Sequence, residues 1–530
     1  MKRNILTSLV FALITISLYA QDPNILWQRT IGGSDLEYLA SINLTNDEGS
    51  IIGGSSSSNI SGEKNENSNG GIDIWILKID SQGEIQWQNT IGGSGDDNLF
   101  LNGKIIQTTD GGYFLGCTSN SNISGDKTEN SKGFNDFWVL KLSASGDIEW
   151  QKTIGGSGQD FLFSLLQTND NGFVIGGSST SNISGDKTED SQGSNDYWVL
   201  KINETGMIEW QNTIGGSETE ILQDIRQTSD GGFIVGGSSY SGISGDKTEA
   251  SNGGADYWIV KLNQIGIIDW QKTFGGSDEE ILRNILQTDD EGYIISGESN
   301  SNISGDKTEN SNGDYDYWII KTNSTGNIEW QNTIGGSESE RFPRIIESPG
   351  IGYIVGGESY SNISGDKTEN SKGLSDCWVL LINDAGNILN QKTIGGNDYD
   401  GVKSFYQNNE GNLIIGADSS SNISGDKTEN SRGDSDYWIF NLDDVLNISD
   451  KPFATPIILY PNPTKNTLQI NTQDKTIDQV NIYTMAGSKV LQLNVDTVSP
   501  IVDVSSLASG VYYLQLYSGK NVALKKFVKE

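Results

Sequence analysis

Hydrophobic and polar positions follow one pattern that repeats along most of the chain. Tryptophans of an Asp-x-Trp motif fall at positions 75, 138, 198, 258, 318, 378 and 438, and those of a Trp-Gln motif at 27, 87, 150, 210, 270 and 330. The period is 60 residues, with an insertion of three near Asn102, and Asn390 stands where a seventh Trp-Gln pair would begin. Repetition at such a period is typical of solenoids and propellers, so the pattern indicates seven copies of one unit.

Each copy contains four short segments with strand character. In one copy they span residues 280–288, 293–298, 316–323 and 328–333. Turns rich in Asp, Asn and Gly follow the first and third segments, whereas a long polar loop follows the second. In the third segment Tyr317 and Ile319 point to one face of the strand and Trp318 and Ile320 to the other. Both faces are apolar, so we expect neighbouring units to cover both.

The two ends of the repeat region complement each other. Residues 25–30 form a fourth segment with no third before it, and residues 436–440 form a third with no fourth after it. A solenoid would need polar capping repeats, and none is visible. The sequence therefore predicts an all-β fold, with a seven-bladed β-propeller over residues 21–447. Its blades are four-stranded, and the N-terminal strand closes the last blade.

The segments outside the repeats predict how the chain is processed. A basic start followed by an apolar run indicates a signal peptide over residues 1–20, cleaved after Ala20. The run is too short for a transmembrane helix, and we find no other transmembrane segment. Residues 448–457 contain two prolines and are predicted to form a linker.

Charge and residue types narrow the function. Residues 21–450 carry 25 basic and 65 acidic residues, a net charge of −40. Such a body is expected to bind no nucleic acid, which needs a basic face. The absence of histidine removes the commonest general base and transition-metal ligand. Cys117 and Cys377 lie in different repeats, and we expect no disulfide between them.

The segment 458–530 differs from the repeats in composition, and its alternating strands suggest a small immunoglobulin-like β-sandwich. Its motifs Leu-Tyr-Pro-Asn-Pro (459–463), Val-Asn-Ile-Tyr (480–483), Asp-Val-Ser-Ser-Leu-Ala-Ser-Gly-Val-Tyr-Tyr (503–513) and Lys-Lys-Phe-Val-Lys (525–529) come in order. In these motifs the segment resembles the type A sorting domain of the Bacteroidetes type IX secretion system. The resemblance implies that residues 458–530 bind the secretion machinery, that the domain is removed, and that the protein stays on the outer surface or is released. The repeats resemble the glycine- and tryptophan-rich units that precede such domains in other proteins. This second resemblance implies no particular activity.

The long loop is the first candidate site. The sequence SNISGDKTENS recurs unchanged at 121–131, 301–311, 361–371 and 421–431, and strand direction places all seven loops at one end of the ring. Its hard oxygen ligands suit calcium, which would be a bound cofactor. The candidate ligands are Asp126, Glu129, Asn130, Asp136, Asp186, Asp196, Asp306, Asp316, Asp366, Asp376, Asp426 and Asp436. The alternative is that these groups cap turns and bond their own backbone.

Three classes of function remain. The first is a secreted, non-catalytic binding, adhesion or scaffold protein with an unknown protein or glycan ligand. The second is a lectin, in which loop tyrosines such as Tyr240 and Tyr360 contact sugar. The third is a polysaccharide-active enzyme, for which the departures from the repeat (102–104, 341–344, Asn390 and the two cysteines) offer no acid, base and nucleophile together. We favour the first.

Overall fold

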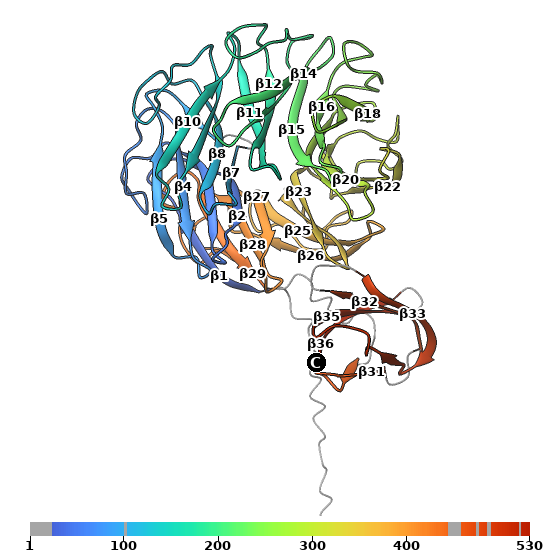
Figure 1. Ribbon diagram of the computed structural model, residues 1–530. Helices are drawn as coiled ribbons and strands as arrows, with labels where there is room; N and C mark the ends of the chain where they lie inside the picture. Colours follow the sequence, from blue (N-terminus) through green and yellow to red (C-terminus); the bar gives the residue numbers. More distant parts are fainter. Residues whose placement is uncertain (1–23, 100–102, 444–456, 473–475, 485–488, 519–520) are drawn as a thin grey trace, which may run out of the picture.

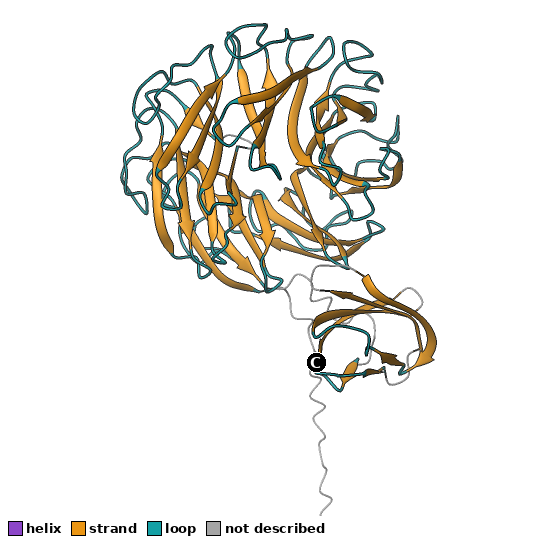
Figure 2. Ribbon diagram, viewed as in Figure 1, coloured by secondary structure: helices purple, strands orange, loops and turns teal. Residues whose placement is uncertain are grey.

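The computed structural model describes residues 24–99, 103–443, 457–472, 476–484, 489–518 and 521–530, all as strands, turns and loops (Figure 2). The predicted signal peptide with Ala20, and the predicted linker apart from its last residue, lie outside this part of the chain. Within it, we find no helix that is long and apolar enough to cross a membrane.

Seven antiparallel sheets form a ring (Figure 1). Blade 1 contains β2 (Glu37–Leu44), β3 (Ser50–Ser56), β4 (Asp73–Ile79) and β5 (Ile85–Ile91). Blade 2 contains β6 (Asp97–Asn98), β7 (Lys104–Gln107), β8 (Tyr113–Ser119), β9 (Asp136–Leu142) and β10 (Ile148–Ile154). Blade 3 contains β11 (Asp160–Gln167), β12 (Phe173–Ser179), β13 (Asp196–Ile202) and β14 (Ile208–Ile214). Blade 4 contains β15 (Glu220–Gln227), β16 (Phe233–Ser239), β17 (Asp256–Leu262) and β18 (Ile268–Phe274).

The remaining blades complete the circle. Blade 5 contains β19 (Glu280–Gln287), β20 (Tyr293–Ser299), β21 (Asp316–Thr322) and β22 (Ile328–Ile334). Blade 6 contains β23 (Glu340–Ser348), β24 (Gly352–Ser359), β25 (Asp376–Asn383) and β26 (Ile388–Ile394). Blade 7 contains β27 (Asp400–Gln407), β28 (Leu413–Ser419), β29 (Asp436–Leu442) and β1 (Ile25–Ile31) from the start of the chain. β1 pairs antiparallel with β29, with Thr30 opposite Trp438, so the seven-bladed prediction and the closure by the N-terminal strand are confirmed.

The hydrophobic core lies between blades. Trp318 and Ile320 pack with residues of blade 4, whereas Tyr317 and Ile319 pack with residues of blade 6. The prediction that both faces of the third strand are covered is therefore confirmed. Cys117 and Cys377 are both buried and free, as expected.

The two tryptophan motifs serve one contact that recurs in all seven blades. In blade 5, Trp318 Nε1 donates to Gln331 Oε1 at 3.0 Å, and Gln331 Nε2 donates to the carbonyl of Asp306 at 2.7 Å. The glutamine thus joins the buried tryptophan to the long loop. Closure keeps the contact in blade 7, where Gln28 bridges Trp438 and the carbonyl of Asp426.

The C-terminal residues form two sheets around a separate core. One sheet contains β30 (Ile458–Tyr460), β31 (Thr467–Asn471) and β34 (Ile501–Asp503). The other contains β32 (Thr476–Thr484), β33 (Lys489–Val498), β35 (Gly510–Ser518) and β36 (Asn521–Lys529). Leu468 and Val502 of the first sheet share a buried cluster with Ile482, Leu514 and Phe527 of the second, which gives a small β-sandwich.

Candidate functional site in the central cavity

The candidate calcium ligands of the long loops accept backbone hydrogen bonds. In blade 2, Asp126 Oδ2 accepts from Gly92 N at 3.1 Å, Glu129 Oε2 from Thr153 N at 2.7 Å, Asn130 Oδ1 from Ile123 N at 3.0 Å, and Asp136 Oδ2 from Lys132 N at 2.6 Å. The corresponding carboxylates accept in the same way: Asp186, Asp196, Asp306, Asp316, Asp366, Asp376, Asp426 and Asp436. These contacts match the turn-capping alternative.

The loop carboxylates also link neighbouring blades. Lys132 of blade 2 pairs with Asp186 of blade 3, and Arg432 of blade 7 pairs with Glu63 of blade 1 at 2.6 Å. Burial raises the pKa of Asp126. Among the described residues, no three His, Cys, Asp or Glu side chains are grouped so that they could hold a metal ion. Calcium binding by these loops stays an untested prediction.

The Asp-x-Trp aspartates are buried where blades meet, and five of them are candidate calcium ligands: Asp136, Asp196, Asp316, Asp376 and Asp436. The inner strand of each blade begins with an acidic residue. At all seven junctions, the backbone N–H of this residue donates to a backbone carbonyl of the preceding blade, at 2.6–3.0 Å. That carbonyl belongs to the residue just before the Asp-x-Trp aspartate. One oxygen of each Asp-x-Trp aspartate is buried and has no hydrogen-bond partner among the described residues. Burial raises the pKa of Asp256 to about 7, and the neighbouring carboxylate of Glu280 adds to the rise. The pKa of Asp316 is raised to about 7 by burial, with Glu340 adding to it.

The centre of the ring differs in charge from the rest of the molecule. Side chains of the innermost strands surround a cavity of about 460 Å³. Its lining includes four cationic side chains: Lys104, Arg226, Arg344 and Lys403. No Asp or Glu is among the described residues that line it. A basic cavity in a chain of net charge −35 concentrates positive potential where the low-dielectric walls focus it.

One buried carboxylate holds two of these cations in position. Asp224 Oδ1 lies 2.7 Å from Lys104 Nζ, and its Oδ2 lies 3.1 Å from Arg226 Nε. Asn284 also donates to Oδ2, at 2.5 Å. Burial alone would raise the pKa of Asp224, but the nearby cations, Arg226 first, hold it well below its usual value. Asp224 is therefore ionised and fixes Lys104 and Arg226 at the cavity wall.

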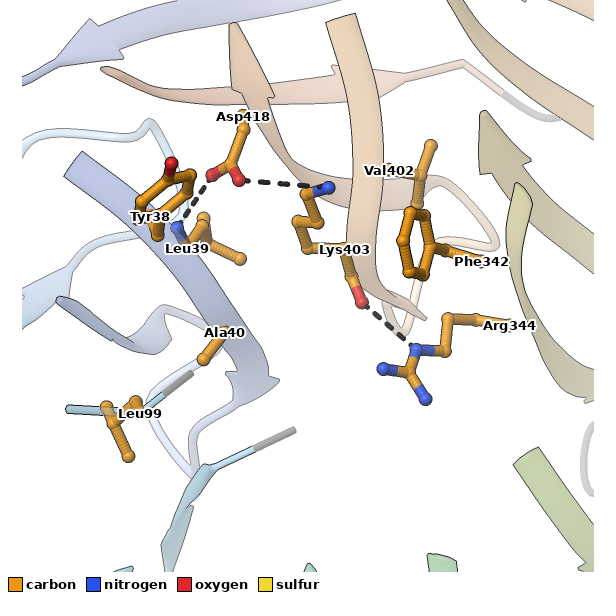
Figure 3. Close-up of a pocket in the computed structure, with 9 residues that line it drawn as sticks. All are labelled: Tyr38, Leu39, Ala40, Leu99, Phe342, Arg344, Val402, Lys403 and Asp418. Carbon is orange, nitrogen blue, oxygen red and sulfur yellow. Dashed lines mark hydrogen bonds and ion pairs between the residues drawn. The ribbon is translucent and has the colours of Figure 1, made fainter. Parts of the chain in front are cut away.

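A smaller cavity of about 190 Å³ adjoins the first and shares Ala40, Arg344 and Lys403 with it (Figure 3). Lys403 Nζ pairs with Glu358 Oε1 at 2.6 Å and lies 3.8 Å from Asp418 Oδ2. Burial raises the pKa of Asp418 to about 7. Arg344 donates from Nε to the carbonyl of Lys403 at 3.3 Å, which ties β23 to β27.

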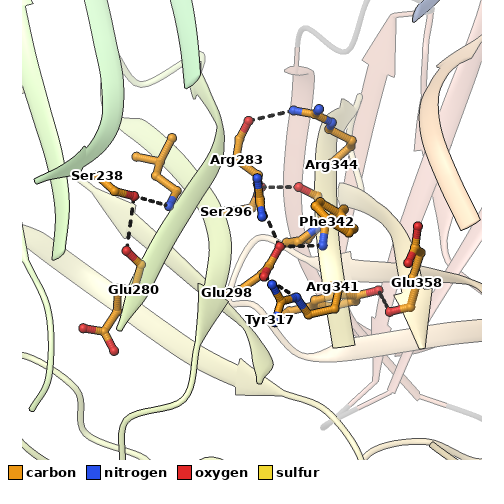
Figure 4. Close-up of polar contacts among 12 residues, drawn as sticks. Ser238, Glu280, Arg283, Ser296, Glu298, Tyr317, Arg341, Phe342, Arg344 and Glu358 are labelled. Carbon is orange, nitrogen blue, oxygen red and sulfur yellow. Dashed lines mark hydrogen bonds and ion pairs between the residues drawn. The ribbon is translucent and has the colours of Figure 1, made fainter. Parts of the chain in front are cut away.

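An irregular segment of β23 contributes Phe342 and Arg344 to this smaller cavity, and Figure 4 shows the polar contacts around it. The pairing with β24 shifts register between Arg341 and Arg344, and Phe342 has a φ of 55°, which is uncommon for a bulky residue. Phe342 N donates to Glu298 Oε1 at 2.7 Å, and Arg341 Nε lies 2.7 Å from Glu298 Oε2. Arg283 lies 4.5 Å above the Phe342 ring and also pairs with Glu298. Strained backbone of this kind is often found at functional sites.

The structure brings together residues that the sequence left apart. Lys104 and Arg344 belong to two departures from the repeat in different blades, at 102–104 and 341–344, yet both line the larger cavity. Asn390 does not join them, because it lies in β26 opposite Leu381. One inner-strand position, which pairs with a Gly or Ser of the second strand, differs between repeats and signals Lys104 and Arg344: its residues are Ser41, Lys104, Ser164, Asp224, Asn284, Arg344 and Ser404. Arg226 and Lys403 lie at other positions of the inner strands and were not predicted from the sequence.

Residues 458–530 match the family model described as a secretion system C-terminal sorting domain. The C-terminal β-sandwich is a type IX sorting domain. The sorting domain marks the chain for export to the cell surface or the extracellular space and implies an interaction with the type IX secretion machinery. The localisation and the family resemblance predicted from the sequence are therefore confirmed.

Solved structures resemble the whole chain only distantly. A protein of unknown function from Bacteroides caccae is 10% identical, with a TM-score of 0.33, and the alignment covers 61% of this chain and 89% of that one. The Pan2 WD40 domain of Neurospora crassa is also 10% identical, with a TM-score of 0.41 and coverage of 79% and 97%. A search of the curated proteins gives no match. The propeller assignment therefore rests on the strand pairing described above.

Proposed function

We propose that this secreted protein is a non-catalytic binding protein whose ligand occupies the central cavity. One observation carries the proposal: charged departures from the repeat gather on the innermost strands. Long-loop residues, by contrast, hydrogen-bond to backbone and to neighbouring blades. Loops longer than turns require often carry function, but here their shared contacts give them a structural task.

The two alternatives have less support. A lectin that used loop tyrosines would need a group of them, yet Tyr240 is 41% exposed in one blade and Tyr360 packs edge-on against Tyr399 at 6.4 Å. A glycosidase of the usual type needs two free carboxyl groups across the scissile bond. Near the cavities, Asp224, Glu298 and Glu358 are each paired with cations. The fourth carboxyl group, that of Asp418, lies 3.8 Å from Lys403 Nζ and accepts a hydrogen bond from Leu39 N at 2.7 Å, so it has no second free carboxyl group beside it among the described residues.

A cavity-filling variant tests the proposal. Ala40 lines both cavities, so Ala40→Trp should block them, whereas Ile303→Ser changes an exposed loop residue on the outer surface. We expect wild type and Ile303→Ser to bind the same members of a panel of extracellular oligosaccharides and peptides, and Ala40→Trp to lose that binding. The proposal fails if binding survives Ala40→Trp, or if a bound oligosaccharide is cleaved.

A further inference from the structure

We propose that the central cavity binds an acidic saccharide, a sugar that carries carboxylate or sulfate groups. This inference rests on the proposed function and names the ligand class for the same cavity. It is argued from the charge of the lining, from the donors that the lining presents, and from the size and remaining chemistry of the cavity.

The positive charge of the lining favours a negatively charged ligand. Four cationic side chains and no carboxylate are among the described lining residues of the larger cavity, although acidic residues outnumber basic ones two to one in the chain. The carboxylate that pairs with two of these cations, Asp224, has a side chain that is only 1% exposed. Arg226 and Lys104 are therefore more accessible to a ligand in the cavity than Asp224 is. Burial of a cation near the cavity also strengthens its attraction for an anion.

Arg226 is the best-placed donor for that anion. Its side chain is 41% exposed, and its Nε bonds to Asp224. Its terminal amino groups make no hydrogen bond with the described residues, and a guanidinium presents two parallel donors that match a carboxylate or a sulfate. Lys104, on the other side of Asp224, is 20% exposed and adds a second positive charge. Asp224 thus orients both side chains without covering the outer edge of Arg226.

The rest of the lining suits a sugar. Hydroxyl and amide side chains contribute to it, and each makes one hydrogen bond or more within the ring and keeps further donor or acceptor capacity: Ser41, Asn43, Gln167, Asn284, Ser404 and Tyr406. Such groups bond the hydroxyls of a sugar ring, and apolar neighbours such as Ile106 and Leu165 offer surface for its C–H faces. A cavity of about 460 Å³ lies in the range used for small ligands. It admits a ligand of a few rings and excludes a folded partner.

Titration calorimetry on the purified protein tests the inference. The probes are a galacturonic acid trisaccharide, the neutral galactose trisaccharide with the same linkage, and inorganic sulfate. We expect the acidic trisaccharide to bind at least tenfold more tightly than the neutral one and than sulfate, and its affinity to fall as salt is raised. Arg226→Gln should weaken the acidic trisaccharide at least tenfold. Arg226→Lys should weaken it less, because the charge stays while the fork of donors is lost.

Lys152→Gln is the matched control, because it removes one positive charge from a side chain that is 44% exposed and pairs with a loop glutamate. It should bind like wild type, and thermal unfolding should show that all three variants are folded. The inference is overturned if the neutral trisaccharide binds equally well, if sulfate alone binds as tightly, or if Arg226→Gln has no effect. Those results leave the proposed function standing provided that Ala40→Trp still abolishes binding of some ligand; if it abolishes none, the proposed function fails as well.

Discussion

The long loops and the innermost strands of the ring show opposite kinds of variation. The loops are nearly identical from blade to blade, and each makes the same hydrogen bonds to a glutamine, to a strand and to the next blade. The innermost strands keep their acidic first residue and vary at the positions that line the cavity. A contact that recurs in all seven blades requires the same residues in each blade. The central cavity is single, and each blade contributes its own side chains to it, so those side chains can differ. Sequence identity between repeats therefore marks the packing, and divergence marks the site.

The largest effect should come from filling the space between a loop and a blade. A Cβ atom on Gly275 would lie 2.1 Å from the carboxylate of buried Asp256, so Gly275→Ala should destabilise the ring by about 3 kcal/mol. Gly242 has no atom within 4 Å of an added Cβ, and all six other repeats have Asn there. Gly242→Asn should leave the midpoint of thermal unfolding unchanged or slightly raised. Equal midpoints for the two variants would contradict the packing role.

The next effect tests the glutamine that joins the loop to the tryptophan. Gln331→Ala leaves Trp318 Nε1 and the carbonyl of Asp306 without their partner. Since an unpaired buried polar group costs about 1–3 kcal/mol, we expect a loss of about 2 kcal/mol in urea unfolding. Gln264→Ala, which changes an exposed turn residue, is the control. A loss no larger than the control would show that the loops are held by other contacts.

The blade junctions should make stability depend on pH. The pKa values of Asp256 and Asp316 are raised to about 7 in the folded protein, above the ordinary value of 3.8, so the folded state holds more protons than the unfolded state between pH 4 and 7. The free energy of unfolding should therefore fall as pH rises through that range. Asp256→Asn supplies a neutral amide and should make the fall smaller, since one pKa unit corresponds to about 1.4 kcal/mol.

The exposed Asp269, which lies 3.9 Å from Lys261, gives the matched control for this experiment. Asp269→Asn should keep the wild-type pH profile in thermal unfolding measured from pH 4 to 7. A profile that rises with pH in the wild type, or identical profiles for the two variants, would rule out the raised pKa values at the junctions.

The smallest effect concerns calcium. Because the loop carboxylates accept backbone hydrogen bonds, we expect excess calcium and chelator to give the same midpoint of thermal unfolding at equal ionic strength. A ligand that binds only the folded ring must raise that midpoint. A rise specific to calcium would make the loops metal sites, and Asp126→Asn together with its equivalents would then be the next variants.

The sequence by itself determined the architecture. The 60-residue period, the alternation around Trp318 and the unpaired strands at 25–30 and 436–440 predicted seven blades and their closure, because local periodicity reports which strand faces are buried. The sequence motifs also determined the sorting domain. Only the tertiary structure decided the site. Lys104, Arg226, Arg344 and Lys403 come from four different blades, and their convergence depends on the closure of the ring, which no local pattern encodes. The packing of each blade on the next also brings the acidic residue that begins an inner strand to the backbone beside a buried Asp-x-Trp aspartate, a contact that sequence spacing does not reveal.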